Sequence, residues 1–325
     1  MKEWWMALTS KLKEVKTIAI LTHKDPDGDG LAAALAVKSF FHWKGIDSDI
    51  VLEASSPKLY HYLQAESMTK EVMPGMSYEC LVILDCHEPS RLGKCALLLD
   101  HAKYIFALDH HEKREVIQGS NTYIDSNAVS VGYLLHKCMF PEIHTAPVTF
   151  KRYYAEAIYT TILNDTDNFV NANTDGSAFQ TASELIELGL KPYEVAHKFL
   201  YNKPALEMRF IGEVLATMET YHHGKILFIH STLEMLERNQ LDQSATSKLT
   251  RWVKGIAGVE VTVYFREIAS SQYRLSLRSV SYPVNKIAEM YGGGGHILAA
   301  GCTIDGTLDA VKETMLQHFA DIEHA

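Results

Sequence analysis

Short apolar runs alternate with helical patterns along the first part of the chain. Four runs rich in β-branched and other apolar residues predict buried strands: TIAILTH (17–23), DIVLE (49–53), CLVILD (80–85) and YIFALD (104–109). Apolar spacings of three and four residues predict a helix from about Asp29 to Trp43 and another near 57–64. This alternation favours an α/β fold, with a mostly parallel sheet and helices on both faces.

The pattern changes further along the chain. Helical patterns dominate from about 130 to 220, and strand patterns return after Gly224 in KILFIHS, VEVTVYFREI and YRLSLRSV. Helices are expected near 233–239, 283–290 and 308–319, which together with these strands is typical of a smaller α+β domain. We therefore expect one domain over 1–190, a helical connector over 191–220 and a second domain over 221–325.

Composition and charge narrow the class of protein. The 325 residues are 47% hydrophobic and 22% charged, which is enough for two globular domains with ample cores. The formal charge of −9 has the wrong sign for holding long nucleic acid, because such binding neutralises many phosphates with basic residues. Any nucleic-acid substrate should therefore be short.

Several features of the sequence favour a cytoplasmic protein. No uncharged apolar run reaches the ~18 to 20 residues needed to cross a bilayer. At the start of the chain, Trp5, Leu8 and Leu12 lie at helical spacing among charges, which predicts an amphipathic helix on the domain surface rather than a secretory signal. The five cysteines form no CxxC pair, which argues against a disulfide framework and a structural zinc site and favours a reducing compartment.

The segment THKDPDGDGLAAALA places four possible metal ligands after the first predicted strand: His23, Asp25, Asp27 and Asp29. A calcium loop is disfavoured, because its twelfth position would be Ala36 instead of Glu and a strand precedes it where a helix should lie. A helix N-cap accounts for the aspartates nearest the predicted helix but not for His23. A metal site is the better hypothesis for this segment.

Two further predicted strands end in similar residues. Asp85 closes CLVILD, and Asp109, His110 and His111 follow the apolar run IFAL. A lone Asp or His at a strand end is more often a hydrogen-bonded turn residue. Here, however, the carboxyl ends of parallel strands share one edge of the sheet, which is where ligands bind. Asp165, at the end of the helical run AIYTTILND, could reach the same edge.

These side chains favour a particular kind of metal site. Histidine and carboxylate ligands without cysteine suit Mn²⁺ or Mg²⁺ better than structural zinc. The number of ligands favours two ions. Paired ions roughly 3.5 to 4 Å apart activate a water molecule and stabilise the oxygens of a phosphoryl group under attack. The sequence thus predicts hydrolysis at phosphorus.

The predicted second domain contains a glycine run, Gly292 to Gly295, followed by His296, and Arg278 lies near the end of a predicted strand. Glycines let backbone N–H groups approach an anion, and the apolar run after His296 predicts a helix whose dipole faces that anion. We interpret the run as a phosphate-binding nest, although a flexible turn is the commoner origin of such a run. No GxGxxG spacing and no GxxxxGK[ST] motif occurs, so neither dinucleotide binding nor a P-loop is indicated.

Taken together, these residues resemble the motifs of the DHH phosphoesterase superfamily. The motifs are matched, in family order, by His23, Asp27 and Asp29; by Asp85; by Asp109, His110 and His111; by Asp165; and, in the companion nucleic-acid-binding domain, by Gly292 to His296. The resemblance covers roughly residues 15–320. Within the superfamily it is similar to the oligoribonuclease and 3′-phosphoadenosine 5′-phosphate (pAp) phosphatase group, called nanoRNases. This sequence departs from the family pattern at Asp167, where the family usually has glycine.

The resemblance implies a role for each residue. His23 and Asp27 would hold one metal ion, Asp29, His110 and Asp165 would hold the other, and Asp85 would bridge both. Asp109 would orient His110, and His111 would contact the scissile phosphate or protonate the leaving oxygen. In the second domain, the nucleotide would be held by Arg278, Gly293, Gly294, Gly295 and His296.

We therefore expect a cytoplasmic enzyme with a DHH catalytic domain and a DHH-associated substrate-binding domain. With two Mn²⁺ ions, or Mg²⁺, it would hydrolyse oligonucleotides of about two to five nucleotides to mononucleotides, and pAp as well, in a cleft between the domains. The alternatives are a cyclic dinucleotide phosphodiesterase, a RecJ-type single-strand exonuclease, an inorganic pyrophosphatase and, from a different class, a non-catalytic nucleotide sensor. No long duplex and no membrane partner is expected, and a homodimer stays open.

Overall fold

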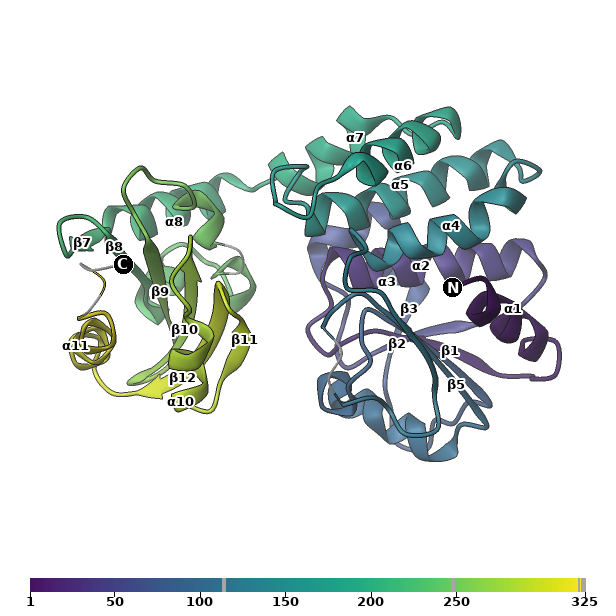
Figure 1. The fold of residues 1–325 in the computed structure, drawn as a ribbon, viewed down its shortest axis with the longest axis horizontal. Coiled ribbons are helices and arrows are strands. Elements are labelled where there is room, and N and C mark those ends of the chain that lie inside the picture. The colour runs from purple at the N-terminus through teal and green to yellow at the C-terminus, as the bar shows by residue number, and fades with distance from the viewer. Residues whose placement is uncertain (113–114, 247–248, 321, 323–325) are drawn as a thin grey trace. The chain divides into compact units, whose positions relative to one another are not determined.

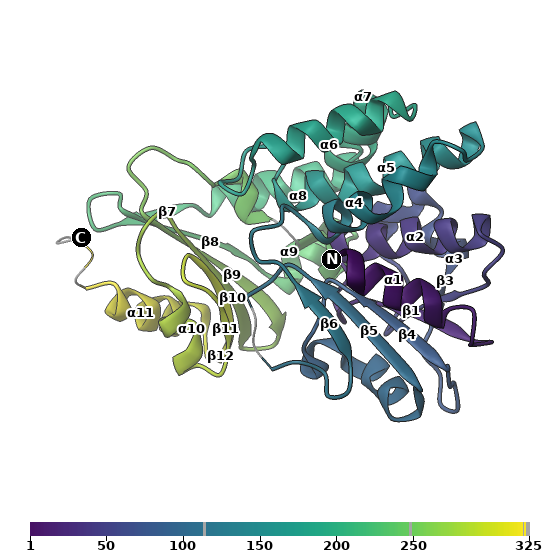
Figure 2. The same ribbon diagram turned by 45° about the vertical axis from the view of Figure 1, so that its right-hand side comes forward.

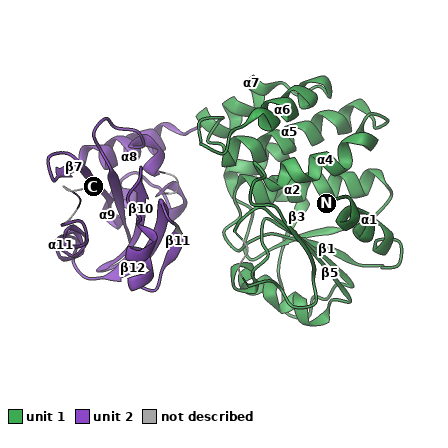
Figure 3. Cartoon of the chain, viewed as in Figure 1, with its two compact units in different colours: residues 1–202 green, residues 203–325 purple. Residues whose placement is uncertain are grey.

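The chain folds into two units, Met1–Asn202 and Lys203–Ala325 (Figure 3). The structure, a computed structural model, describes residues 1–112, 115–246, 249–320 and 322. The boundary lies inside the predicted connector 191–220, which does not form a unit of its own. Val195 and Phe199 pack into the main core of unit 1, whereas Phe210 and Val214 pack against a core of unit 2.

A six-stranded parallel sheet in the order β3-β2-β1-β4-β5-β6 forms the centre of unit 1 (Figures 1 and 2). Its strands are β1 (Ile18–Leu21), β2 (Asp49–Leu52), β3 (Thr69–Glu71), β4 (Cys80–Leu84), β5 (Tyr104–Asp109) and β6 (Asn121–Ile124). The four predicted strands are confirmed. The edge strands β3 and β6 escaped prediction because their sequences, TKE and NTYI, are short and carry no apolar run.

Alternate residues of these strands enter two cores, one on each face of the sheet. Ile18 and Ile20 of β1 belong to one core, and Ala19 and Leu21 belong to the other. This burial on both faces explains why the strands appear in the sequence as continuous apolar runs. The first face is covered by α1 (Lys2–Lys11), α2 (Gly28–Trp43), α4 (Val131–Ile143) and α5 (Val148–Asp165), and the second by the 3₁₀ segment Pro89–His101 (Figures 1 and 2).

Shorter helices complete unit 1. They are the 3₁₀ helix Lys58–Leu63, α3 (Ala65–Met68), α6 (Gly176–Glu187), α7 (Pro192–Ala196) and the π-helical turn His197–Tyr201. The predicted N-terminal helix is present as α1, with Trp4, Trp5 and Leu8 buried against the core. Within the described residues, no helix has both the length and the apolar character that crossing a membrane requires.

Unit 2 is built on a second six-stranded sheet, in the order β11-β12-β10-β9-β8-β7, in which only β8 and β9 pair in parallel. Its elements are α8 (Ala205–Ala216), β7 (Glu219–Tyr221), β8 (Ile226–Ser231), α9 (Leu233–Arg238), the 3₁₀ turns Gln243–Thr246 and Leu249–Trp252, β9 (Val261–Ala269), β10 (Gln272–Ser279), α10 (Asn285–Met290), β11 (Gly294–His296), β12 (Ala299–Asp305) and α11 (Leu308–His318). This confirms the predicted α+β domain.

The glycine run corrects one prediction. The apolar residues after His296 do not form a helix, because Ile297 and Leu298 make a turn and the chain continues as strand β12. Side chains at Gly293 and Gly295 would overlap the backbone of β12, so both glycines are needed for the close pairing of this hairpin. The helix that precedes the run, α10, ends there, so it directs its negative end toward the run and does not favour an anion.

Candidate metal centre

The candidate ligands lie where the strand order of the first sheet reverses. The chain connects β1 toward β2 on one side and β4 toward β5 on the other. In open parallel sheets the loops diverge at such a point, and ligands bind there beyond the carboxyl ends of the strands. His23 follows β1, Asp85 follows β4 and His110 follows β5. The topology therefore brings three of the predicted residues to one edge of the sheet.

Helix α2 begins at this same edge. Asp27 is its N-cap, because its Oδ1 accepts hydrogen bonds from the N–H groups of Asp29 (3.0 Å) and Gly30 (3.3 Å). Gly30 lies against Thr22 and Asp85, and a Cβ at this position would overlap the Thr22 hydroxyl. Asp27 thus serves as the helix N-cap, as one interpretation of the sequence predicted, but this role involves only its Oδ1. Oδ2 accepts from the side chain of Asn164 (2.9 Å).

Asp29 is fully buried and holds two helices together. Its Oδ2 accepts from the N–H of Val131 (2.6 Å) and its Oδ1 from the N–H of Gly132 (3.1 Å), so its carboxylate stabilises the N-terminus of α4. Burial, and then the neighbouring charges of Asp165 and Asp85, raise the pKa of Asp29. The aspartate is thus fixed in position in an environment that disfavours its negative charge.

Two histidines and their carboxylates meet at Asp85. His23 Nε2 lies 3.3 Å from Asp85 Oδ2 and 3.7 Å from Asp27 Oδ1. On the other side, His110 Nε2 lies 3.7 Å from Asp85 Oδ1 and 3.1 Å from Asp165 Oδ2. Asp85 is 2% exposed, and its backbone has a φ of 59°, in the left-handed region that non-glycine residues seldom adopt.

Three groups of side chains could each hold a metal ion, since the ligand atoms of each group lie within 4.8 Å of one another. They are His23, Asp27 and Asp85; Asp29, His110 and Asp165; and Asp85, His110 and His111. Asp85 Oδ1 and Asp165 Oδ2 are buried and have no hydrogen-bond partner among the described residues. Buried carboxylate oxygens without partners are costly unless a cation compensates them, so the residues present fit one or two hard divalent ions.

The charges of the histidines support the same interpretation. Burial alone would lower the pKa of His23, but Asp27 and Asp85 outweigh it and raise that pKa to about 9. Burial is likewise outweighed at His110, where Asp165 and Asp29 raise the pKa to about 11. Without a metal ion, these histidines are thus kept protonated by the surrounding carboxylates. The carboxylates of the cluster therefore favour positive charge on the groups that they surround.

His111 and Asp109 form a neighbouring arrangement that includes an unpredicted residue, His87. Asp109 is fully buried, and its Oδ1 is 2.8 Å from His111 Nδ1 and accepts from the N–H of His110 (2.7 Å). Its Oδ2 is 2.5 Å from Nδ1 of the buried His87. Burial opposes the charged form of Asp109, but His111 and His87 lower its pKa. The sequence signal that could have identified His87 is its position two residues after Asp85, at the end of a strand.

Asp109 thus orients His111, whereas the predicted orientation of the His110 ring is provided elsewhere. His110 Nδ1 lies 3.1 Å from the backbone carbonyl of Ala128, and Asp109 reaches only the backbone N–H of His110. Carbonyl groups commonly fix ligating imidazoles in this way. The predicted role of Asp109 toward the His110 ring is therefore not supported by the contacts.

Two other acidic residues of these segments have different positions. Asp25 is exposed and belongs to none of the three groups. Asp167 has a φ of 47°, and the next two residues, Asn168 and Phe169, are also left-handed. Glycine adopts this conformation without strain, which explains in physical terms why it suits this position.

The predicted substrate residues of unit 2 lie on adjacent strands. Arg278 is exposed near the end of β10, and its Nη1 donates to the carbonyl of Leu277 (2.8 Å). Its backbone pairs with Ala299 of β12, which also pairs with His296 of β11. The side chain of His296 lies outside the described part of the structure. The structure places Arg278 beside the glycine hairpin. The pairing of the strands explains both the position of Arg278 and the glycines without a ligand contact.

Comparisons with known proteins define the class to which the chain belongs. Residues 17–162 match the family model described as the DHH family, N-terminal domain, and residues 226–322 match the DHHA1 domain. The chain therefore contains a DHH-family N-terminal domain followed by a DHHA1 domain.

Individual proteins that resemble this chain over most of its length include two curated relatives and one solved structure. The chain is 26% identical over 306 residues to the bifunctional oligoribonuclease and PAP phosphatase NrnA of Thermus thermophilus, covering 92% of this chain and 88% of the relative. It is 25% identical over 298 residues to the probable protein of the same name from Streptococcus mutans, covering 90% and 91%. An exopolyphosphatase-related protein from Bacteroides fragilis has the same fold, with a TM-score of 0.88, 20% identity and coverage of 100% and 98%.

Proposed function

We propose that this chain is a metal-dependent phosphodiesterase that hydrolyses oligonucleotides of about two to five nucleotides to mononucleotides, with pAp as a further substrate. The observation that carries the proposal is the position of Asp85, whose two carboxylate oxygens lie 3.3 Å from His23 Nε2 and 3.7 Å from His110 Nε2, one histidine of each proposed ligand set. A carboxylate shared in this way is what a site for two adjacent ions requires.

Six residues would hold the two ions, Mn²⁺ or Mg²⁺. His23 and Asp27 would bind one, Asp29, His110 and Asp165 would bind the other, and Asp85 would bridge them. Divalent ions would supply an activated water and would neutralise charge on the phosphoryl oxygens. The ligand set contains no cysteine, and the buried carboxylates without partners favour hard cations.

Other residues of the chain would contact the phosphate, donate a proton and bind the nucleotide. Asp109 fixes the ring of His111 through Nδ1, and Nε2 of His111 would contact the scissile phosphate or give a proton to the leaving oxygen. Asp109 and Asp85 outweigh the effect of burial and raise the pKa of His111 to about 9, which favours the protonated imidazole. Arg278, the glycine run and His296 would bind the part of the nucleotide that does not react.

The choice of substrate rests on the relatives and on charge. The relatives are named as oligoribonucleases and PAP phosphatases, and a chain with a net charge of −9 gains little from additional phosphates. A compartment that keeps thiols reduced belongs to the same proposal, because all five cysteines are free. We also propose 1–190 as the catalytic domain and 221–325 as the substrate-binding domain.

The test is a series of single strands from dinucleotide to thirty-mer, with pAp and a cyclic dinucleotide alongside, at fixed salt with Mn²⁺. We expect kcat/KM to be highest at about two to five nucleotides and to fall for longer strands, because each added phosphate meets few basic residues. A rate that rises steadily to the thirty-mer would favour a RecJ-type exonuclease. Preference for the cyclic substrate would favour a cyclic dinucleotide phosphodiesterase. Binding without any turnover would favour a nucleotide sensor.

A further inference from the structure

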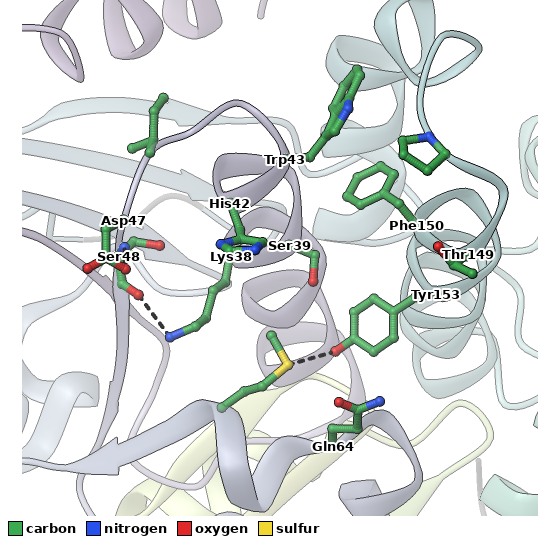
Figure 4. A pocket seen from close by; sticks show the side chains of 13 residues that line it. Lys38, Ser39, His42, Trp43, Asp47, Ser48, Gln64, Thr149, Phe150 and Tyr153 are labelled. Atoms are coloured by element: carbon green, nitrogen blue, oxygen red, sulfur yellow. Dashed lines mark hydrogen bonds between the residues drawn. The ribbon is translucent and has the colours of Figure 1, made fainter.

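A pocket of about 570 Å³ lies in unit 1 at the end of α2 that is remote from the metal centre (Figure 4). It is lined by the last turns of α2, the turn from α2 to β2, the start of α5 and the chain around α3. Lys38 in the pocket follows Asp29 of the metal centre by about 14 Å along the helix, at ~1.5 Å per residue. The volume falls within the range of about 300 to 1,000 Å³ that is typical of small-molecule sites.

The inner part of this pocket offers hydrogen-bond donors that the protein does not use. Ser48 is 5% exposed, and its Oγ has no hydrogen-bond partner among the described residues. The Lys38 ammonium donates to the carbonyl of Ser48 (2.8 Å), which leaves two of its three N–H groups for other partners (Figure 4). A buried hydroxyl without a partner is costly, and a bound acceptor would remove that cost.

The charge of Lys38 is also poorly compensated. Asp49, a neighbouring carboxylate, is paired instead with Lys70 (2.8 Å) and accepts from Tyr78 (2.9 Å). Asp47 also lines the pocket, and its Oδ1 accepts from the backbone N–H of Ser48 (3.0 Å). Burial lowers the pKa of Lys38 despite these two aspartates. An anionic group beside the Lys38 ammonium would therefore pair with a charge that is already partly desolvated.

Aromatic side chains form the outer walls. Trp43 and Phe150 lie with their ring centroids 5.3 Å apart, and the ring of Tyr153 lies beside them on α5 (Figure 4). The hydroxyl of Tyr153 is already occupied, since it donates to the carbonyl of Leu63 (2.8 Å). The Lys44 ammonium lies over the Trp43 ring, 4.0 Å from its centroid, and Phe150 stacks on Tyr154, so a flat ring of a ligand would pack mainly against ring edges.

We propose that this pocket binds a small molecule that joins an anionic group to a planar aromatic ring. The anion lies at the Lys38 ammonium and the Ser48 hydroxyl, and the ring lies against Trp43, Phe150 and Tyr153. Nucleoside monophosphates and aromatic carboxylates share this chemistry. The proposal stands independently of the reaction at the metal centre.

Isothermal titration of the whole chain tests this site, with a chelator present so that the metal centre takes no part. The probes are adenosine 5′-monophosphate and phenylacetate, with adenosine as the probe that lacks an anion. We expect saturable 1:1 binding of at least one anionic probe, and at least tenfold weaker binding in Lys38→Met and in Ser48→Ala. Lys13→Met, which removes an exposed lysine elsewhere in unit 1, should bind as the wild type does. Arg278→Ala tests whether the nucleotide probe binds at the proposed substrate site instead.

Each outcome decides the proposal. Binding of the nucleotide alone identifies a nucleotide site, and binding of phenylacetate alone identifies a carboxylate site. Adenosine that binds as tightly as its monophosphate would overturn the assignment of the anion to Lys38. The proposal is also wrong when neither anion binds, or when binding is lost in Arg278→Ala but kept in both pocket variants. Ser48→Ala guards against a folding defect in Lys38→Met, and thermal unfolding of both variants checks this directly.

Discussion

The two regions that carry the predicted chemistry are built in different ways. In unit 1 the candidate ligands come from four separate segments and converge on the buried Asp85, where two carboxylate oxygens have no hydrogen-bond partner among the described residues. In unit 2 Arg278 is an exposed strand residue, and Gly293 and Gly295 are required by the pairing of a hairpin. Folding alone explains the second region but not the first, because converging buried charges oppose folding.

This difference shows how to weigh a motif. A glycine run that removes a clash has a structural explanation, and its value as evidence of a phosphate site falls accordingly. A cluster of buried carboxylates in which two oxygens have no hydrogen-bond partner among the described residues has no such explanation, and its value as evidence of a cation site rises. The comparison can be tested by substitutions in both regions.

Asp85→Ala should have the largest effect. The change removes the carboxylate common to two of the possible ligand groups, so we expect kcat/KM for a dinucleotide with Mn²⁺ to fall by about a thousandfold or more. The measurement is turnover together with bound metal per chain after extensive dialysis against a chelator and reconstitution.

Asp167→Gly is the matched control for this change. It also removes an aspartate close to the cluster in sequence, but Asp167 has a φ of 47° that glycine adopts freely, so activity should change little. Full activity of Asp85→Ala in metal-free buffer would contradict the two-metal hypothesis, and equal losses in both variants would show that negative charge in general, rather than ligation, is what matters.

His87→Asn should have the next largest effect. His87 lies 2.5 Å from Asp109, which in turn orients His111, so its loss should lower kcat by about 10- to 100-fold while KM and bound metal stay near the wild-type values. His136→Asn is the control, because His136 is equally buried and bonded to Tyr154 but belongs to none of the possible ligand groups. Similar losses of kcat in the two variants would mean that His87 acts through stability alone.

Much of unit 1 could be predicted because its chemistry follows apolar strands. The runs CLVILD and YIFALD are buried on both faces, so the strands and the residues that close them stand out together. His87 could not be assigned, because its partner Asp109 is 22 residues away and the contact depends on the pairing of β4 with β5. Asp29 was expected as a helix-capping residue or ligand, but its bonds to α4 depend on tertiary packing.

The second region was harder to predict for a related reason. The sequence YGGGGHILAAG contains an apolar segment that suits a helix or a strand, and only pairing with β10 decides for β12. The short strands β7 and β11 were missed because three residues carry no periodicity. Local pattern predicts long elements, whereas edges of sheets depend on their neighbours.

Arg278→Ala tests the second region and should have an intermediate effect. We expect KM for a dinucleotide to rise by about tenfold, with a much smaller change for a generic aryl phosphodiester, because a recognition contact acts on the part of the substrate that does not react. His296→Ala should behave in the same way. Arg274→Ala is the control, since Arg274 is also exposed on β10 and shares its face of the strand with Arg278. Equal losses on both substrates would instead place Arg278 in catalysis.

The smallest effect is expected within the glycine run, where two substitutions separate backbone pairing from ligand binding. A Cβ at Gly293 would overlap the carbonyl of Gly301, so Gly293→Ala should destabilise unit 2 by about 1 to 3 kcal/mol in urea unfolding. A Cβ at Gly294 meets nothing within 4 Å, so Gly294→Ala should leave stability unchanged. Should the run also bind phosphate, Gly294→Ala will raise KM for a dinucleotide by about fivefold, the equivalent of one hydrogen bond of about 1 kcal/mol. We expect that rise. An unchanged KM in the stable Gly294→Ala variant would show that the run serves the hairpin alone.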